Sequence, residues 1–122
     1  MPLAQIDLPR ALFEEKATAI GLELQAAFVE AAGVPPADKF QIFRPREAGE
    51  LVFDPSYGGV DRQNLIVVQI LMVHHHPVDQ KRALYRAIVE RFVKLGIRKE
   101  DILIAVTENG FEDWYGGKLY GE

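Results

Sequence analysis

The segment Leu65–Val73, with the sequence LIVVQILMV, constrains the fold of this 122-residue chain most strongly. Its residues are apolar at successive positions, interrupted by Gln69, and many are branched, which is typical of a strand buried on both faces. The segment is too short to cross a bilayer. Helices on one face would leave the other face uncovered, so we expect another copy of the chain to cover it in an obligate oligomer.

The beginning of the chain has the pattern of a strand, a helix and a second strand. Leu3–Leu8 predicts a short strand, and Pro9 suits the first turn of a helix, where a missing N–H costs nothing. Gly33 suits the helix end, and an apolar strand follows Asp38. The apolar residues between these ends recur at helical spacing: Phe13, Ala17, Ile20, Leu24, Ala27, Phe28 and Ala31. These features predict a β-α-β unit.

The same order recurs in the second half. The strand Leu65–Val73 leads into a helix that begins at Pro77 and ends at Gly96. Asp101 lies five residues after this glycine, as an aspartate does in the first half, and the apolar strand Ile102–Val106 follows. Because the proline and glycine positions also agree, we interpret the two halves as a repeat.

The two pseudo-repeats, about residues 2–53 and 64–106, predict an α+β fold class made of α/β-type units. The tandem β-α-β repeat would form a four-stranded sheet with two helices on one face, because each crossover should be right-handed. Residues 1–122 have a length suited to a single domain with one core.

Two segments lie outside this repeat. Residues 43–64 are rich in Arg, Gly, Pro and Asp and predict a loop, with Leu51–Phe53 as one arm of a hairpin. Residues 109–122 form a tail in which four aromatic residues lie among glycines. We expect this tail to dock on a neighbouring subunit.

Composition excludes several classes of function. The formal net charge of −4 and the lack of a basic run argue against a nucleic-acid or membrane-surface partner. The absence of cysteine excludes disulfides and thiolate chemistry. The N-terminus lacks the pattern of a signal peptide, so we expect a cytoplasmic protein. Neither a phosphate-binding glycine loop nor a serine nucleophile elbow is present.

Several segments resemble one family. MPLAQIDL, GVPPADKFQ and DQKRALYRAIVERF resemble the tautomerase superfamily, and EDILIAVTENGFEDWYGG resembles its malonate semialdehyde decarboxylase-like branch. The resemblance covers essentially the whole chain in order. It implies the tandem β-α-β fold, a homotrimer whose sheets face inward, and chemistry without a cofactor, based on the secondary amine of an N-terminal proline.

The resemblance implies that Pro2 is the catalytic amine once Met1 is removed, with Asp38 as its acidic partner. An α-amino group titrates at about 7.7–8.0, where proton transfer in both directions is useful. If Met1 stays attached, the Pro2 nitrogen is an amide without basicity. Asp38 could orient the amine or activate a water, or it could be a turn residue, as the equivalent position of Asp101 suggests.

The branch carries two arginines, one residue apart, that bind the substrate carboxylate, and His74 and His76 occupy the matching positions. Strand alternation puts these two on one face and His75 on the other. Imidazolium rings would bind a carboxylate more weakly and with more pH dependence than arginines. The alternatives are a structural role, as caps and packing groups, and an incomplete metal site, which we favour least.

The resemblance also implies that Trp114, with Tyr115, forms a wall of the pocket. Arg44 and Arg46 are spaced to lie on one face of a strand, and Arg62 follows the loop. Any of the three could supply positive charge for a substrate carboxylate, with Arg44 as our first candidate. The alternative for each one is a solvated arginine.

The leading hypothesis is a cofactor-independent tautomerase that acts on a small 2-oxo or enol carboxylic acid. The second is a decarboxylase or hydratase of a 3-oxo or unsaturated acid, which the missing arginine pair disfavours. A third, from a different class, is a non-catalytic homotrimer that binds a small molecule or a metal. The histidine cluster supports this third hypothesis.

Overall fold

The computed structural model describes residues 1–74 and 76–120, so His75 and the last two residues of the tail lie outside the described residues. The described chain forms one mixed sheet, two long helices and three short 3₁₀ turns. Their bounds in chain order are β1 (Pro2–Pro9), α1 (Arg10–Ala32), β2 (Phe40–Arg46), η1 (Tyr57–Gly59), β3 (Ile66–Val73), α2 (Val78–Lys94), η2 (Lys99–Asp101), β4 (Ile102–Asn109) and η3 (Phe111–Asp113).

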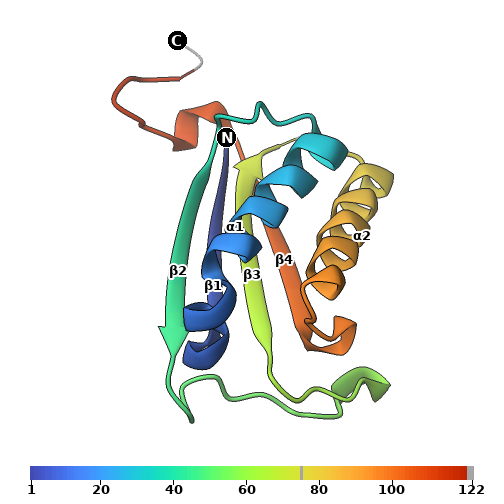
Figure 1. Ribbon diagram of the computed structural model, residues 1–122. Helices are drawn as coiled ribbons and strands as arrows, with labels where there is room; N and C mark the ends of the chain where they lie inside the picture. The colour runs from blue at the N-terminus through green and yellow to red at the C-terminus, as the bar shows by residue number, and fades with distance from the viewer. Residues whose placement is uncertain (75, 121–122) are drawn as a thin grey trace.

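The sheet has the strand order β2-β1-β3-β4. β1 pairs in parallel with β2 and β3 in parallel with β4, while β1 and β3 meet antiparallel at the centre. Both helices lie across the same face of the sheet (Figure 1). The predicted fold of two tandem β-α-β units is therefore confirmed.

The core lies between the sheet and the helices. Alternate side chains of the central strands point into it, as the two-residue period of a strand requires. The largest fully buried side chains are Phe28, Phe92, Ile6, Leu8, Ile20, Leu24, Ile66, Ile70, Leu84, Ile88 and Val68. Most of the buried part of the stripe predicted for the first helix, including Ile20, Leu24 and Phe28, belongs to this core. No helix within residues 1–74 and 76–120 has the length and apolar character needed to cross a membrane.

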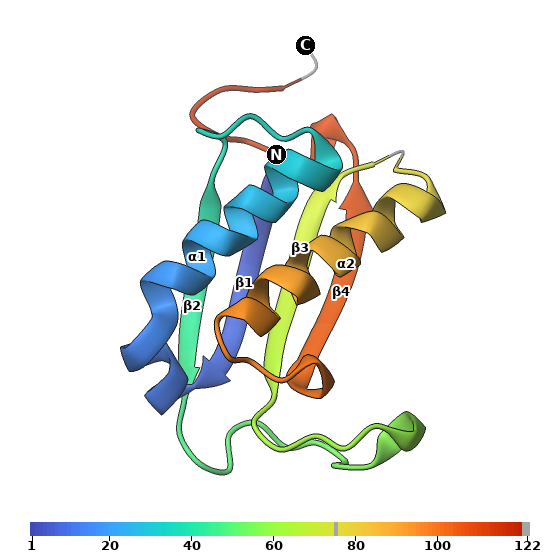
Figure 2. The same ribbon diagram turned by 45° about the vertical axis from the view of Figure 1, so that its right-hand side comes forward.

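The opposite face of the sheet carries no helix (Figure 2). Cross-strand partners share a face, so this face begins on β1 with Leu3, beside Phe40 of β2 and Leu71 of β3. Phe40 is 52% exposed and Leu103 of β4 is 45% exposed. Asp7 is buried on the same face by Arg44 and Arg46, at 3.0 and 2.8 Å from its two oxygens. In this chain alone, apolar residues of the sheet therefore meet solvent.

Gly21 lies within an unbroken α1 for a packing reason. The side-chain amide of Gln41 on β2 donates a hydrogen bond of 2.9 Å to the Gly21 carbonyl. A Cβ atom at Gly21 would lie 2.6 Å from Gln41 Oε1. Glycine therefore allows α1 and β2 to approach closely here, in spite of its low helix propensity.

The predicted hairpin arm at Leu51–Phe53 is wrong. These residues form no strand, and Val52 is 88% exposed. The next residues turn instead, because Asp54 Oδ1 accepts hydrogen bonds from the backbone and the hydroxyl of Ser56 at 2.8 and 3.1 Å. Local turn chemistry thus outweighs the apolar pattern of this segment.

The end of α1 gives a direct test of the fold. Gly33 has φ of +65° and its N–H bonds to the Phe28 carbonyl, so Gly33→Ala should cost about 1 kcal/mol of unfolding free energy. Gly33→Asn should cost less, because asparagine tolerates the left-handed conformation better. Urea denaturation of the three proteins measures both effects. Equal midpoints would contradict this account of the helix end.

Candidate active site

The antiparallel pairing of β1 and β3 brings three distant parts of the chain to one end of the sheet. Pro2, at the start of β1, lies opposite Met72, near the end of β3. The loop from the end of α1 to β2 arrives at the same end, since β2 runs parallel to β1 (Figure 2). His74 and His76, which follow β3, and Phe111 of the short η3 turn after β4 also lie there.

A cavity of about 340 Å³ opens at this end. It is lined by Met1, Pro2, Ala32, Gly33, Val34, Pro35, Asp38, Met72, Val73, His74, His76 and Phe111. The structure thus brings together four residues that the sequence singles out: Pro2, Asp38, His74 and His76. They come from both halves of the repeat, so neither half forms this cavity alone.

The N-terminus lies at the acidic side of the cavity. The Met1 ammonium is 3.1 Å from Asp38 Oδ2, and both side chains are largely buried. The backbone of Asp38 is fixed, since its carbonyl accepts a hydrogen bond of 3.0 Å from Gln25 and its N–H donates to Pro35. This rigid loop directs the carboxylate at the terminal amine.

Asp101 occupies the equivalent place in the second repeat but has a different environment. It is 3% exposed, and its Oδ1 accepts hydrogen bonds from the Gln63 N–H at 2.7 Å and from Arg98 at 3.2 Å. These contacts tie the second repeat to the preceding loop. Asp101 therefore has the structural role that the sequence leaves open for both aspartates, whereas Asp38 lines the cavity that contains Pro2, His74 and His76.

Glu108 holds the histidine side of the cavity. Its Oε2 accepts the backbone N–H of His76 at 3.1 Å and lies 3.2 Å from His76 Nδ1. Its Oε1 forms an ion pair with Lys81 of α2. The bond from Lys81, followed by that from the His76 N–H, lowers the pKa of Glu108 to about 2, so the carboxylate is ionised at neutral pH. The backbone of His74 is fixed separately, by a hydrogen bond of 2.7 Å to the Asn109 carbonyl.

Sequence reasoning missed Glu108, although a signal was present. In the alternating strand ILIAVTEN, Glu108 has the same parity as Ile102, Ile104 and Val106, which pack against the core. A carboxylate on the core-facing side of a strand requires a cationic or donor partner. The cavity-lining Phe111 was likewise not singled out among the aromatic residues of the tail.

The other predicted site residues do not line this cavity. Trp114 does not line the cavity, and its Nε1 donates a hydrogen bond of 2.7 Å to Asn109 Oδ1. Tyr115 is 72% exposed. Arg44 lies on the uncovered face of the sheet, where it binds Asp7 and Gln5 at 3.0 and 3.1 Å. Arg46 binds Asp7 as well, and Arg62 donates to the Tyr57 carbonyl.

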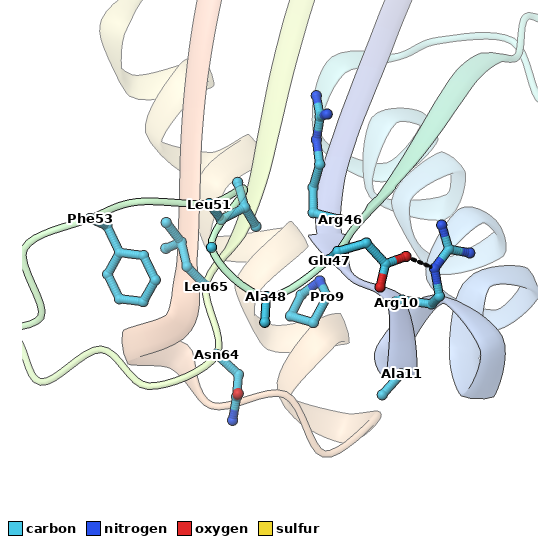
Figure 3. Close-up of a pocket in the computed structure, with 11 residues that line it drawn as sticks. Pro9, Arg10, Ala11, Arg46, Glu47, Ala48, Leu51, Phe53, Asn64 and Leu65 are labelled. Atoms are coloured by element: carbon cyan, nitrogen blue, oxygen red, sulfur yellow. Dashed lines mark hydrogen bonds and ion pairs between the residues drawn. The ribbon is translucent and has the colours of Figure 1, made fainter.

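A second cavity, also of about 340 Å³, lies where β1 and β2 end, at the far end of the sheet (Figure 3). Arg10 and Glu47 form an ion pair at its rim, and Leu51 and Phe53 line its apolar side. Arg46 also lines the cavity, and its guanidinium forms an ion pair with Asp7. The two arginines here are therefore paired within the chain, and Pro2, Asp38, His74 and His76 do not line this cavity.

The described residues contain no group of three or more His, Cys, Asp or Glu side chains that could hold a metal ion.

Comparison with known proteins identifies the family to which this chain belongs. The family model described as "Tautomerase enzyme" matches residues 38–115. The probable tautomerase YusQ of Bacillus subtilis (strain 168) is 35% identical over 119 residues, which cover 96% of this chain and 94% of that protein.

Two solved structures are similar over most of the chain. The FG41 malonate semialdehyde decarboxylase inhibited by 3-bromopropiolate aligns with a TM-score of 0.89 and 26% identity, over 98% of this chain and 91% of that one. A fused 4-OT, described as a wild-type symmetric trimer, aligns with a TM-score of 0.75 and 19% identity, over 89% and 86%. The family model and the relative YusQ together define a protein of the tautomerase family. The chain belongs to the tautomerase superfamily, as the sequence predicts.

The acid dependence of stability tests the Glu108 contacts. A folded-state pKa of about 2, below the ordinary value of 4.5, means that these contacts stabilise the protein above pH 4.5 and are lost as pH falls towards 2. We expect Glu108→Gln to be less stable than the parent at pH 6, with the difference shrinking between pH 4.5 and 2. Urea midpoints measured across this range test it, and a difference that stayed constant would contradict it.

Proposed function

We propose that this protein is a cofactor-independent tautomerase of small 2-oxo or enol carboxylic acids, active once Met1 is removed. The observation that carries the proposal is that Pro2, Asp38, His74 and His76 line one and the same cavity. This cavity combines a position for a secondary amine, a carboxylate and two imidazoles. Belonging to the tautomerase superfamily supports the proposal.

The amine of Pro2 would move the proton. In the neutral state it takes the proton from the enol oxygen, so the O–H bond breaks and an enolate remains. The electron pair of the C=C bond then takes a proton from the resulting ammonium as the carbonyl forms, which restores the amine. One group of intermediate basicity can perform both steps, since it gains and loses a proton near neutral pH.

Asp38 would orient the amine and stabilise its protonated form. Its Oδ2 lies 3.1 Å from the ammonium of Met1, the residue before Pro2. A carboxylate close to a developing ammonium favours the charged form. His74 and His76, across the cavity, would receive the substrate carboxylate.

Arg44, Trp114 and Tyr115 could contribute to the site only with another copy of the chain, or after movement of the tail. Arg44 is held by Asp7 on the uncovered sheet face. Trp114 and Tyr115 lie on the tail, which leaves the body of the molecule at the cavity end (Figure 1). Their roles in substrate binding stay predictions.

A second candidate reaction is decarboxylation or hydration of a 3-oxo or unsaturated acid. The similarity to a malonate semialdehyde decarboxylase, at 26% identity over nearly the whole chain, favours it. The histidines in place of an arginine pair argue for the tautomerase, because imidazoles hold a carboxylate less firmly. A panel of small oxo and unsaturated acids separates the two reactions.

We propose a homotrimer in which the helix-free sheet faces meet. The two-sided apolar pattern of β3 and the exposed apolar side chains Phe40, Ile42 and Leu103 support it. The trimeric state of the fused 4-OT with the same fold supports it as well.

Replacement of the proposed amine tests the mechanism. In protein shown by intact mass to lack Met1, Pro2→Ala should lower kcat/KM for phenylenolpyruvate at least about a hundredfold, the usual size of a general acid–base contribution. Turnover is followed by the loss of enol absorbance. Pro36→Ala, in a loop near the cavity but outside its lining, is the matched control and should keep the parent rate. Unchanged turnover by Pro2→Ala would refute the proposal.

A charge on the uncovered sheet face tests the assembly. Ile42→Glu should convert the trimer to smaller species, because a carboxylate buried at an interface lacks a partner. Leu22→Glu, a matched change at an exposed leucine of α1, should leave the trimer intact. Sedimentation velocity distinguishes the two. Dissociation by the α1 variant alone would place the interface on the helices.

A further inference from the structure

Glu108 is the central member of a chain of three charged or titratable groups that ends in the cavity. Lys81 of α2 contacts one carboxylate oxygen, and His76 contacts the other through both its backbone N–H and its ring. The His76 and Glu108 side chains are each 21% exposed, and Lys81 is 28% exposed. The three residues come from α2, β4 and the segment after β3, so the fold itself assembles them.

The two bonds from His76 to one oxygen fix the orientation of the ring. Backbone and ring are held by the same Oε2 atom, at 3.1 and 3.2 Å, so rotation of the side chain would break the ring contact. Nδ1 therefore interacts with Glu108. Nε2 is then the ring nitrogen left to interact with a molecule in the cavity that His76 lines.

The ionisation of Glu108 also fixes where the ring carries its proton. An ionised carboxylate only accepts hydrogen bonds, so the nitrogen beside it must donate. A neutral His76 therefore has its proton on Nδ1 and a bare lone pair on Nε2. A carboxylate can accept a hydrogen bond from Nε2 only after the ring gains a second proton, on that nitrogen.

We propose that Glu108, held by Lys81, is a positioning residue that makes binding of a substrate carboxylate at His76 take up one proton. The inference rests on the proposed function for the presence of a carboxylate substrate. It assigns Glu108 and Lys81 a role in substrate binding at a distance from the reacting atoms. Binding of an anionic substrate then weakens as pH rises, because the proton becomes harder to supply.

Other charged or titratable groups face the same cavity and can also change their protonation when an anion binds. Asp38 lies on the loop before β2, the terminal amine lies at the start of β1, and His74 precedes the histidine of interest. The terminal amine can also change its protonation when an anion binds. The test therefore has to assign the proton to His76 and not to the cavity as a whole.

The first experiment is ¹⁵N NMR of the histidine rings in ligand-free protein that lacks Met1, at a pH where His76 is neutral. His76→Asn identifies its signals. We expect the proton on Nδ1 in the parent protein. Glu108→Gln should shift it partly towards Nε2, because a neutral amide oxygen holds the proton on Nδ1 less strongly than an ionised carboxylate does. Glu112→Gln, an exposed carboxylate nearby, is the matched control and should leave the ring unchanged. A parent ring protonated on Nε2 would overturn the proposal, whatever the enzymatic activity.

The second experiment is calorimetry with 3-phenylpropanoate, a carboxylate that lacks the oxo group and cannot turn over. Titrations at pH 8 in buffers of different ionisation enthalpy give the number of protons taken up. We expect up to about one more proton in the parent than in His76→Asn or Glu108→Gln, as complete protonation of a neutral ring requires. Equal uptake in all three proteins, or no binding to the parent, would overturn the assignment. Because neither experiment requires turnover, a failure here is separate from a failure of the Pro2→Ala test.

Discussion

The antiparallel pairing of β1 with β3 is the constraint on which the candidate site depends. It places Pro2 beside Met72, so that the start of β1, in the first β-α-β unit, meets the end of β3, in the second. Two units joined side by side in parallel would have put the N-terminus and the histidine segment at opposite ends. The parallel pairing within each unit then brings the Asp38 loop to the same end. The cavity is a product of the whole topology.

The same arrangement explains why the two repeats differ in chemistry. Asp38 and Asp101 follow their helices at the same spacing, yet Asp38 lines the cavity that contains Pro2, whereas the Oδ1 of the buried Asp101 accepts hydrogen bonds from Gln63 and Arg98. A chain has only one N-terminal amine, and here it lies at the start of β1. The proposed chemistry is therefore confined to the end of the sheet where β1 begins, and the corresponding position at the start of β3 has no such amine.

The fold could be predicted from the sequence almost completely. The two-sided apolar pattern of β3, the helical stripe ending at Gly33 and the repeated proline and glycine positions gave the right elements in the right order. The segment at Leu51–Phe53 could not be predicted, because the turn made by Asp54 and Ser56 decides its conformation. Pro2, Asp38, His74 and His76 were singled out through family resemblance more than through physical pattern, and the structure brings them to one cavity. Glu108 was missed because its role depends on Lys81, which lies 27 positions away in the sequence and meets it only in the fold.

The central claim is that a free Pro2 amine in this cavity is basic and reactive. Labelling with 2-oxo-3-pentynoate measures this directly, because a neutral secondary amine adds to the triple bond of this acetylenic 2-oxo acid while an ammonium or an amide does not. Peptide mass spectrometry at pH 7 should find one label, on Pro2, in protein without Met1, and none at this site in protein that retains Met1. A protein without Met1 that remains unlabelled at Pro2 would contradict the account.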